Sequence, residues 1–278
     1  MAITAEDLRC YIKHLEEEER STGTIEKYSR DVHAFVAWLD GREVTRELVC
    51  IWRKMLLDRG QAPTTVNSKL SAINGLLDVL GLWECKVKLL KIQRKTFRES
   101  SKELTRDEFR RLVETAQGQG QDRLALLLET ICATGIRVSE VQYITVEAAS
   151  QGRADIFLKG KIRTILLPNK LCRKLLKYAK KHKIASGEIF LTRSGASLSR
   201  RQIWREMKSL CKVANIEPSK VFPHNLRHLF ATVFYRTTRD IAKLADLLGH
   251  SSIETTRIYL ITNGSEHARQ LERLKLVC

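Results

Sequence analysis

The stretch GHSSIETTRIY (residues 249–259) is the part of the chain around which the rest is organised. Ser251 and Glu254 have the spacing of a capping box, which predicts a helix that begins after His250 and holds Tyr259 about two turns in. Taken alone, such a His is usually a loop residue and such a Tyr is usually packed in a core. Two further segments, PHNLRH at 223–228 and ATGIRVSE at 133–140, change this interpretation.

Together, the three segments supply the side chains needed to attack a phosphodiester. His224 and Arg227 are three residues apart on a helix that Pro223 is predicted to open, so they share one face. Arg227 stands among apolar residues, and a buried Arg requires an anion, either a carboxylate or a phosphate. Arg137 follows the predicted helix end at Gly135 and can supply a second guanidinium. Two Arg forks on one phosphate would neutralise the charge that develops in a transition state.

The phenol of Tyr259 is the candidate nucleophile. A phenol with a pKa of about 10 must lose its proton, or have its oxyanion stabilised, before it attacks at neutral pH. The imidazoles of His224 and His250 are suited to proton transfer or to hydrogen bonding with the phosphate. The departing alkoxide needs a general acid, and a Lys at a hairpin tip, Lys159 or Lys161, would serve.

A metal site is a weaker interpretation of the same residues. His224 and His228 have the spacing of two zinc ligands in a metalloprotease helix, but no Glu follows the first His. Arg227 between them would also repel a cation. His228 is better explained as a packing or supporting residue, and we expect neither a metal nor another cofactor.

The composition is that of a globular chain with room for two domains. Its 278 residues are 43% hydrophobic and 29% charged, and at this length each of two domains can bury a core. No run of about 18 apolar residues occurs, so we expect no transmembrane helix. The N-terminus lacks the pattern of a signal peptide, which predicts a cytoplasmic protein. The seven Cys are widely spaced and indicate neither a disulfide framework nor a zinc ribbon.

The basic charge is concentrated in the C-terminal two thirds of the chain. Residues 1–88 contain 13 Lys and Arg against 14 Asp and Glu, whereas the remaining residues contain 36 against 18. An excess of this size in one folded region suggests a polyanion as partner. Charge alone leaves nucleic acid, an acidic membrane surface and plain solubility open as explanations.

Residues 1–88 are predicted to form a compact bundle of four amphipathic helices. Thr4 and Thr45 are the expected N-caps of the first and third helices, and Pro63 is expected to open the fourth. The segment 89–103 reads as an extended basic linker that can track a phosphate backbone. Its candidate DNA contacts are Lys91, Arg94 and Lys95.

A second domain is predicted from residue 104, because Thr105 and Glu108 form a capping box. Residues 154–158 and 163–167 are expected to pair as a hairpin, and 188–192 to form a further short strand. A helix at 199–214 is the best candidate for contact with DNA, although a solvated basic face explains it equally well. Its candidate DNA contacts, together with the hairpin Lys161, are Arg200, Arg201 and Arg205.

Four segments, in this order, resemble the tyrosine recombinase (phage integrase) family. They are ATGIRVSE at 133–140, KGK at 159–161, PHNLRHLFAT at 223–232 and LLGH at 247–250 followed by Tyr259. The helical segment 1–88 is similar to the family's core-binding domain, so the resemblance covers nearly the whole chain. It implies a mainly α-helical fold with a small antiparallel β-sheet. The four-helix core-binding domain (1–88) would be joined by the linker (89–103) to a mixed α/β catalytic domain (104–278).

The resemblance also implies a mechanism on duplex DNA. Tyr259 would attack the scissile phosphate, leaving a 3′-phosphotyrosyl link and a free 5′-hydroxyl. Two sequential strand exchanges would then pass through a Holliday junction, without ATP or metal. Around the phosphate, the resemblance implies a cluster of Arg137, Lys159, His224, Arg227 and His250, with Lys159 favoured over Lys161 as the acid.

The family further implies a tetramer on DNA with inverted half-sites, in which a C-terminal segment passes to a neighbouring protomer. Residues 266–276, with Leu271, Leu274 and Leu276, are the candidate segment. The chain starts directly at the helical bundle, which favours a recombinase of the Xer or small-integrase kind acting in the cytoplasm on the nucleoid. Two other functions remain open: a non-catalytic DNA-binding accessory protein of this fold, and a type IB topoisomerase-like enzyme that relaxes DNA.

Overall fold

The computed structural model describes residues 1–92, 102–158, 161–250, 252–257, 259 and 272. It divides into two compact units, Met1–Arg94 and Lys95–Cys278, which are described separately below. No helix in the described part of the chain is long and apolar enough to cross a membrane.

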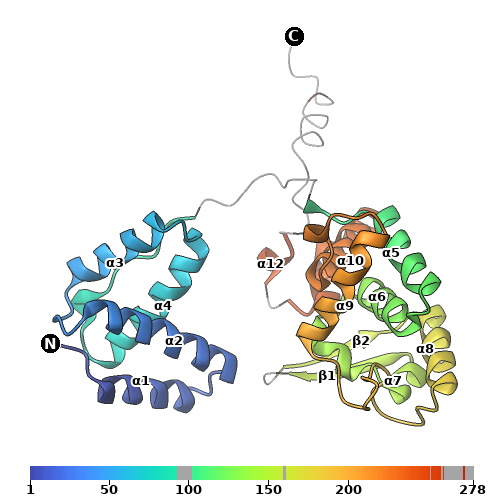
Figure 1. The fold of residues 1–278 in the computed structure, drawn as a ribbon, viewed down its shortest axis with the longest axis horizontal. Helices are drawn as coiled ribbons and strands as arrows, with labels where there is room; N and C mark the ends of the chain where they lie inside the picture. Colours follow the sequence, from blue (N-terminus) through green and yellow to red (C-terminus); the bar gives the residue numbers. More distant parts are fainter. Residues whose placement is uncertain (93–101, 159–160, 251, 258, 260–271, 273–278) are drawn as a thin grey trace. The chain divides into compact units, whose positions relative to one another are not determined.

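The first unit is the predicted four-helix bundle (Figure 1). Its helices are α1 (Ala5–Glu17), α2 (Thr22–Leu39), α3 (Arg46–Asp58) and α4 (Pro63–Val79), followed by the 3-10 turn η1 (Trp83–Cys85). The side chains of Thr4 and Thr45 accept hydrogen bonds from Asp7 and Leu48 backbone N–H groups, which confirms both predicted caps. The largest fully buried side chains of this bundle are Trp52, Tyr11, Phe35, Leu39, Leu70, Ile73, Leu76 and Leu77.

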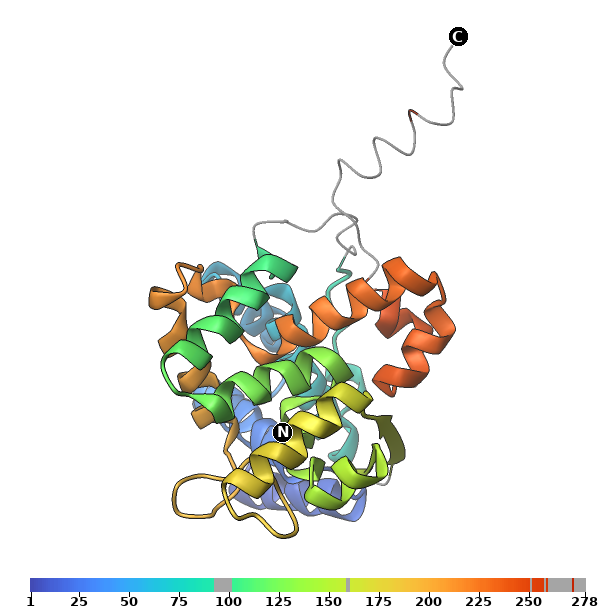
Figure 2. The same cartoon turned by 90° about the vertical axis from the view of Figure 1, so that its right-hand side faces the viewer.

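The second unit surrounds a buried central helix, α6 (Asp122–Thr134). Figure 2 shows α6 between its neighbours, and it contacts α5, α8 and α10. The described elements of this unit are α5 (Arg106–Gly118), α6, η3 (Val138–Tyr143), α7 (Val146–Gln151), β1 (Arg153–Leu158), β2 (Lys161–Leu166), α8 (Asn169–Lys181), α9 (Arg200–Val213), η4 (Pro218–Lys220), α10 (Pro223–Thr238), α11 (Ile241–Leu248) and α12 (Ile253–Arg257). The fold is therefore mainly α-helical with one small antiparallel sheet, as the resemblance implied.

The sheet is the predicted hairpin. Strands β1 and β2 pair antiparallel, with Ala154 opposite Ile165 and Leu158 opposite Lys161 at the turn. Adjacent residues of β1 alternate with the period of two that a half-buried sheet requires, because Ile156 is 1% exposed and Phe157 is 60% exposed. The second strand begins two residues earlier than the sequence pattern indicated.

Two local predictions are wrong. Residues 188–192 form no strand and make only isolated bridges, Thr145 with Glu188 and Leu191 with Ser197, because no neighbouring strand continues the pairing. Tyr259 does not lie inside α12, which ends at Arg257. It lies in a turn in which its N–H donates to the carbonyl of Thr256. The C-terminal segment 266–276, predicted to pass to a neighbouring protomer, falls outside the described residues, except for Glu272.

Gly75 gives a test of packing in the first unit. A Cβ at this helical position would lie 2.7 Å from the hydroxyl oxygen of buried Tyr11, which donates to the carbonyl of Ala72. Gly75→Ala should therefore lower the free energy of unfolding by about 1–2 kcal/mol, because overpacking outweighs the gain of about 1 kcal/mol in helix propensity. Urea denaturation followed by tryptophan fluorescence measures this change.

The matched control is Gly23→Ala on α2, where an added Cβ meets nothing within 4 Å. This control should be as stable as the wild type or more stable. A Gly75→Ala protein more stable than the wild type would contradict the packing described here.

Candidate active site

In the second unit, the C-terminal ends of α6 and α11 lie close to the first half of α10. Helix α6 ends at Gly135, whose φ of 64° is left-handed, and the ring of Phe230 occupies the space where a Cβ would stand. Glycine is therefore required at this turn. Helix α11 likewise ends at Gly249, with φ 62°. The two turns bring Arg137 and His250 toward the first half of α10.

Arg227 on α10 joins these ends. Its guanidinium donates to the carbonyl of Gly135, to the carbonyl of Leu248 at 2.7 Å and to Nε2 of His250 at 3.1 Å. The side chain is 3% exposed. These bonds fix its position, since a planar guanidinium fork with several acceptors has little rotational freedom.

Among the described residues, no carboxylate pairs with Arg227. Burial, and secondarily the charge of Arg137, lower the pKa of Arg227 to about 10, while hydrogen bonding to Tyr259 opposes the shift. The cation is still protonated at neutral pH. A buried cation held only by neutral acceptors retains a net charge that an anionic ligand would stabilise.

Arg137 and Arg163, which lies on β2, share one carboxylate. Glu140, 2% exposed, accepts from the backbone N–H of Arg137 at 2.7 Å and from its guanidinium at 2.9 Å. Glu140 also accepts a hydrogen bond, at 2.5 Å, from the guanidinium of Arg163 on β2. The side chain of Arg137 remains 42% exposed, so one face of its guanidinium is open to a ligand.

Sequence reasoning missed Glu140 and Arg163 as members of this site. Glu140 stands three residues after Arg137, and a capping-box contact joins them at the start of η3. Arg163 stands two residues before buried Ile165, on the inward face of β2. A charged residue at an inward position of a strand was the available signal.

His250 is held as a neutral imidazole. Its Nε2 accepts from Arg227, and its Nδ1 lies 2.9 Å from the hydroxyl of fully buried Thr256. These partners assign the proton to Nδ1. Burial, followed by the charges of Arg227, Arg137 and Arg163, lowers the pKa of His250 to about 4.

Tyr259 packs among three imidazole rings. Its ring centroid lies 6.1 Å from that of His224, 5.3 Å from His228 and 5.8 Å from His250, to which it is nearly parallel. It is 4% exposed and belongs to a small core with Leu244. The structure thus brings together five of the six predicted catalytic residues: Arg137, His224, Arg227, His250 and Tyr259.

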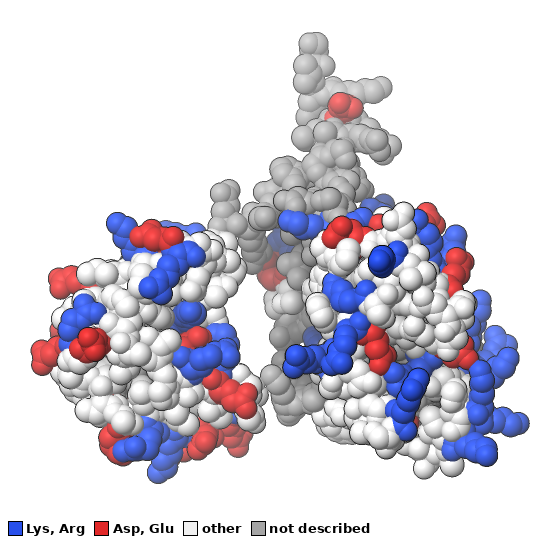
Figure 3. All heavy atoms as spheres, in the orientation of Figure 1, with Lys and Arg blue, Asp and Glu red and all other residues white. Residues whose placement is uncertain are grey.

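The remaining predicted residues are less fully described. Lys159, Arg94 and Lys95 lie outside the described residues, and for Lys161 only the backbone in β2 is described. Lys91 is exposed, as are Arg200, Arg201 and Arg205 on α9. The opposite face of α9 is buried through Ile203, Met207 and Leu210. Figure 3 shows several Lys and Arg side chains on the face of this unit that carries α9.

The described residues include no group of three His, Cys, Asp or Glu side chains placed to hold a metal ion. His224 and His228 both face Tyr259.

Comparison with known families defines the class of the protein. Residues 102–266 match the phage integrase family, and residues 8–81 match the phage integrase N-terminal SAM-like domain. The first match alone spans more than half of the chain. The chain therefore belongs to the phage integrase family, as the resemblance of its motifs indicated.

Individual relatives are tyrosine recombinases of the Xer type. The chain is 28% identical to tyrosine recombinase XerA of Pyrococcus furiosus, covering 99% of this chain and 96% of the relative. It is 29% identical to tyrosine recombinase XerD of Halalkalibacterium halodurans, covering 88% and 90%.

Solved structures share the fold. XerH bound to a palindromic difH substrate, in a post-cleavage complex, matches with a TM-score of 0.74 at 18% identity, covering 95% of this chain and 84% of that one. A lambda integrase (75–356) dimer bound to a COC′ core site matches with a TM-score of 0.73 at 16% identity, covering 92% and 94%.

The low pKa of His250 has a measurable consequence for stability. Because this pKa is about 4 in the folded chain and 6.5 ordinarily, the unfolded state binds the proton first, and protonation favours unfolding. The contribution of neutral His250 to the free energy of unfolding is complete above pH 6.5 and is lost as the pH falls toward 4. The free energy of unfolding of the wild type should therefore fall more steeply across this window than that of His250→Gln.

Urea denaturation at a series of pH values measures both slopes. His182→Gln, at an exposed position after α8, is the matched control and should follow the wild type. Parallel curves for the wild type and His250→Gln would contradict the burial of a neutral imidazole in this pocket.

Proposed function

We propose that this chain is a site-specific tyrosine recombinase that cleaves and rejoins duplex DNA through a 3′-phosphotyrosyl intermediate and a Holliday junction. The observation that carries the proposal is the buried guanidinium of Arg227, which has no carboxylate partner among the described residues and lies beside Tyr259. A phosphodiester is the anion that fits a pocket with a phenol at its edge.

In the proposed reaction, Arg227 and Arg137 hold the non-bridging oxygens of the scissile phosphate. The Tyr259 oxygen attacks phosphorus, the P–O5′ bond breaks and the phenol proton passes to a base in the pocket or to water. A hairpin lysine, Lys159 or Lys161, protonates the departing 5′-oxygen. Attack by a 5′-hydroxyl on the phosphotyrosine then restores a phosphodiester and releases the phenol, so no external energy source is consumed.

His224 and His250 have different proposed roles in this step. His224 is exposed and its ring lies beside that of Tyr259, so it is placed to accept the phenol proton or to donate to the phosphate. His250 already accepts from Arg227 and holds that guanidinium in place. Its neutral form is suited to this second role, because a cation would repel Arg227.

Duplex DNA is the proposed partner, recognised as two inverted half-sites. The exposed Arg200, Arg201 and Arg205 of α9 and the basic segment with Lys91, Arg94 and Lys95 would contact backbone or bases. A DNA substrate of this kind would place the protein in the cytoplasm, on the nucleoid.

Replacing the nucleophile tests the proposal. Wild-type protein is mixed with fragmented genomic DNA of its source organism, and the covalently retained ends are sequenced to locate the cleavage positions. Tyr259→Phe should then form no covalent complex on a nicked duplex built on such a position, while its affinity for that duplex changes by less than about threefold. Denaturing gels and a binding titration measure the two quantities.

Three outcomes count against the proposal. Covalent trapping by Tyr259→Phe would overturn the assignment of the nucleophile. Specific binding by the wild type without any covalent complex would favour a non-catalytic accessory protein. Relaxation of supercoiled plasmid by a monomer without site preference would favour a type IB topoisomerase-like enzyme.

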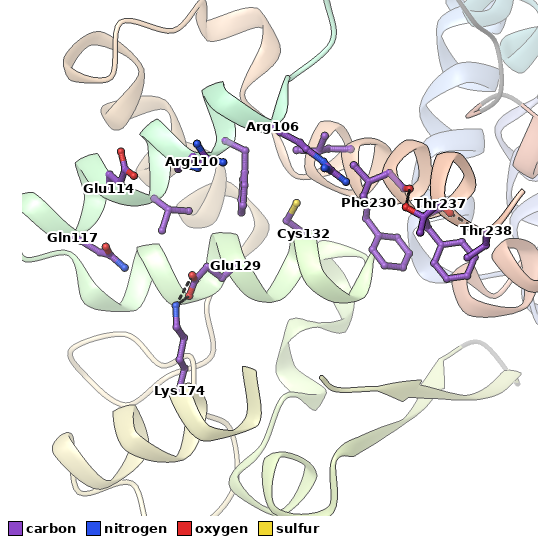
Figure 4. Close-up of a pocket in the computed structure, with 15 residues that line it drawn as sticks. Arg106, Arg110, Glu114, Gln117, Glu129, Cys132, Lys174, Phe230, Thr237 and Thr238 are labelled. Carbon is purple, nitrogen blue, oxygen red and sulfur yellow. Dashed lines mark hydrogen bonds and ion pairs between the residues drawn. The ribbon is translucent and has the colours of Figure 1, made fainter. Parts of the chain in front are cut away.

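We further propose that the protein acts as a tetramer in which a C-terminal segment docks on the neighbouring protomer. A groove of about 810 Å³ runs between α5, α6 and α10 (Figure 4). Its walls include Phe109, Phe230 and Phe234, and burial raises the pKa of the Cys132 thiol in it to about 12. The proposed occupant is residues 266–276 of a second copy, which carry Leu271, Leu274 and Leu276.

A charge in this groove should weaken the assembly. Val233 lines the groove, and Val233→Glu should raise the dissociation constant of the DNA-bound tetramer at least about tenfold, because a carboxylate there is desolvated by an apolar segment. Sedimentation of the protein on a DNA with two sites measures it. Val213→Glu, 62% exposed at the end of α9 and outside the groove, should assemble normally. Unchanged assembly of folded Val233→Glu would contradict the docking.

A further inference from the structure

Arg163 is a third arginine of the pocket, and no step of the proposed reaction uses it. It lies on β2, opposite Ile156 and two residues after Lys161. The sequence between β1 and β2 contains Lys159, so Arg163 stands four residues from the favoured general acid. Its side chain is 15% exposed, and burial, opposed by Glu140, lowers its pKa.

The contacts of Arg163 connect β2 to two other parts of the pocket. One terminal nitrogen donates to Glu140 at 2.5 Å, and the other donates to the carbonyl of Leu247 at 3.2 Å. Glu140 in turn holds both the backbone and the guanidinium of Arg137. Among the described residues, Nε of Arg163 is buried without a hydrogen-bond partner. The hydrogen bonds of the two terminal nitrogens offset the cost of leaving Nε without a partner.

Gly249 completes the link. A Cβ at this residue would clash with the side chain of Arg163, so the arginine passes directly against the turn that precedes His250. The carbonyl of Gly249 also lies 3.5 Å from the guanidinium of Arg137. One side chain thus touches the turn before His250 and, through Glu140, the phosphate-binding Arg137.

Besides the core packing of its inward residues, such as Ile156 and Ile165, the hairpin has few polar anchors to the rest of the unit among the described residues. An isolated two-stranded hairpin is marginally stable in water, and the outward residues Phe157 and Ile162 are 60% and 72% exposed. A second anchor is the hydroxyl of Tyr143, which donates to the carbonyl of Phe157 at 2.6 Å. That bond holds β1, whereas Arg163 holds β2.

We propose that Arg163 is a positioning residue that fixes the hairpin against the Arg137–Glu140 pair and the Gly249 turn, so that the hairpin lysine reaches the 5′-oxygen. The inference rests on the proposed function. In the affected step the P–O5′ bond breaks, its electron pair goes to O5′ and a proton from the lysine ammonium neutralises it. Loss of Arg163 should therefore impair protonation of the leaving group and leave the phosphate-binding arginines in place.

A 5′-bridging phosphorothiolate tests this selectively, because a thiolate leaves without a proton. The probe is the nicked duplex described above, with sulfur in place of the scissile 5′-oxygen. Arg163→Met should cleave the ordinary duplex about 100-fold more slowly than wild type, the usual size of a general-acid contribution. On the sulfur-containing duplex, the cleavage rate of Arg163→Met should lie within about threefold of the wild-type rate. Equal losses on both duplexes would overturn the proposal.

Coupling to the lysine gives a second measure. If Arg163 acts through Lys159, adding Arg163→Met to Lys159→Met should slow the ordinary duplex by no more than about threefold beyond Lys159→Met alone. If Arg163→Met instead lowers the cleavage rate by its full factor both in Lys159→Met and in Lys161→Met, Arg163 acts through neither lysine. Arg163→Lys, which retains the charge but lacks the fork, should show the same preference for sulfur and serves if the Met variant fails to fold.

Arg153→Met is the matched control, because Arg153 is exposed on β1 and outside the pocket. It should cleave both duplexes at the wild-type rate. Failure of the wild type to cleave either duplex would refute the proposed function itself. If the wild type cleaves both duplexes but Arg163→Met shows equal losses on them, only the Arg163 proposal fails.

Discussion

The structure depends on one constraint, the burial of a guanidinium without an opposing carboxylate among the described residues. Arg227 is held by the carbonyls that end α6 and α11 and by His250. Those carbonyls are themselves left over at helix ends, so the arginine satisfies them while they fix its direction. The arrangement leaves a positive charge in a pocket lined by Tyr259, which is the environment that the proposed phosphodiester ligand and the proposed nucleophile require.

The surrounding fold holds the charged groups of this pocket in fixed positions. Gly135 and Gly249 permit the sharp turns that bring helix ends together, and Glu140 locks Arg137 to Arg163. Tyr259 lies beyond the end of α12, in a turn.

Much of the fold and of the site was predictable from the sequence, and the predictions that failed did so for physical reasons. Helix caps and the hairpin follow local rules, so Thr4, Thr45 and the 154–167 region were correctly assigned. The clustering of Arg137, Arg227 and His250 was accessible because each lies beside a marked helix end. Arg163 and Glu140 were missed because their pairing joins residues that are distant in sequence, and a Glu near an Arg is common on surfaces. The strand expected at 188–192 failed because propensity cannot supply a pairing partner.

In the proposed reaction, Tyr259 becomes joined to a DNA 3′-phosphate in this pocket. Mass spectrometry of the covalent complex, after digestion of protein and DNA, identifies the modified peptide and the end to which it is attached. We expect a nucleotide 3′-phosphate on Tyr259 and a free 5′-hydroxyl on the other fragment. An adduct on another residue, or attachment through a 5′-phosphate, would contradict it.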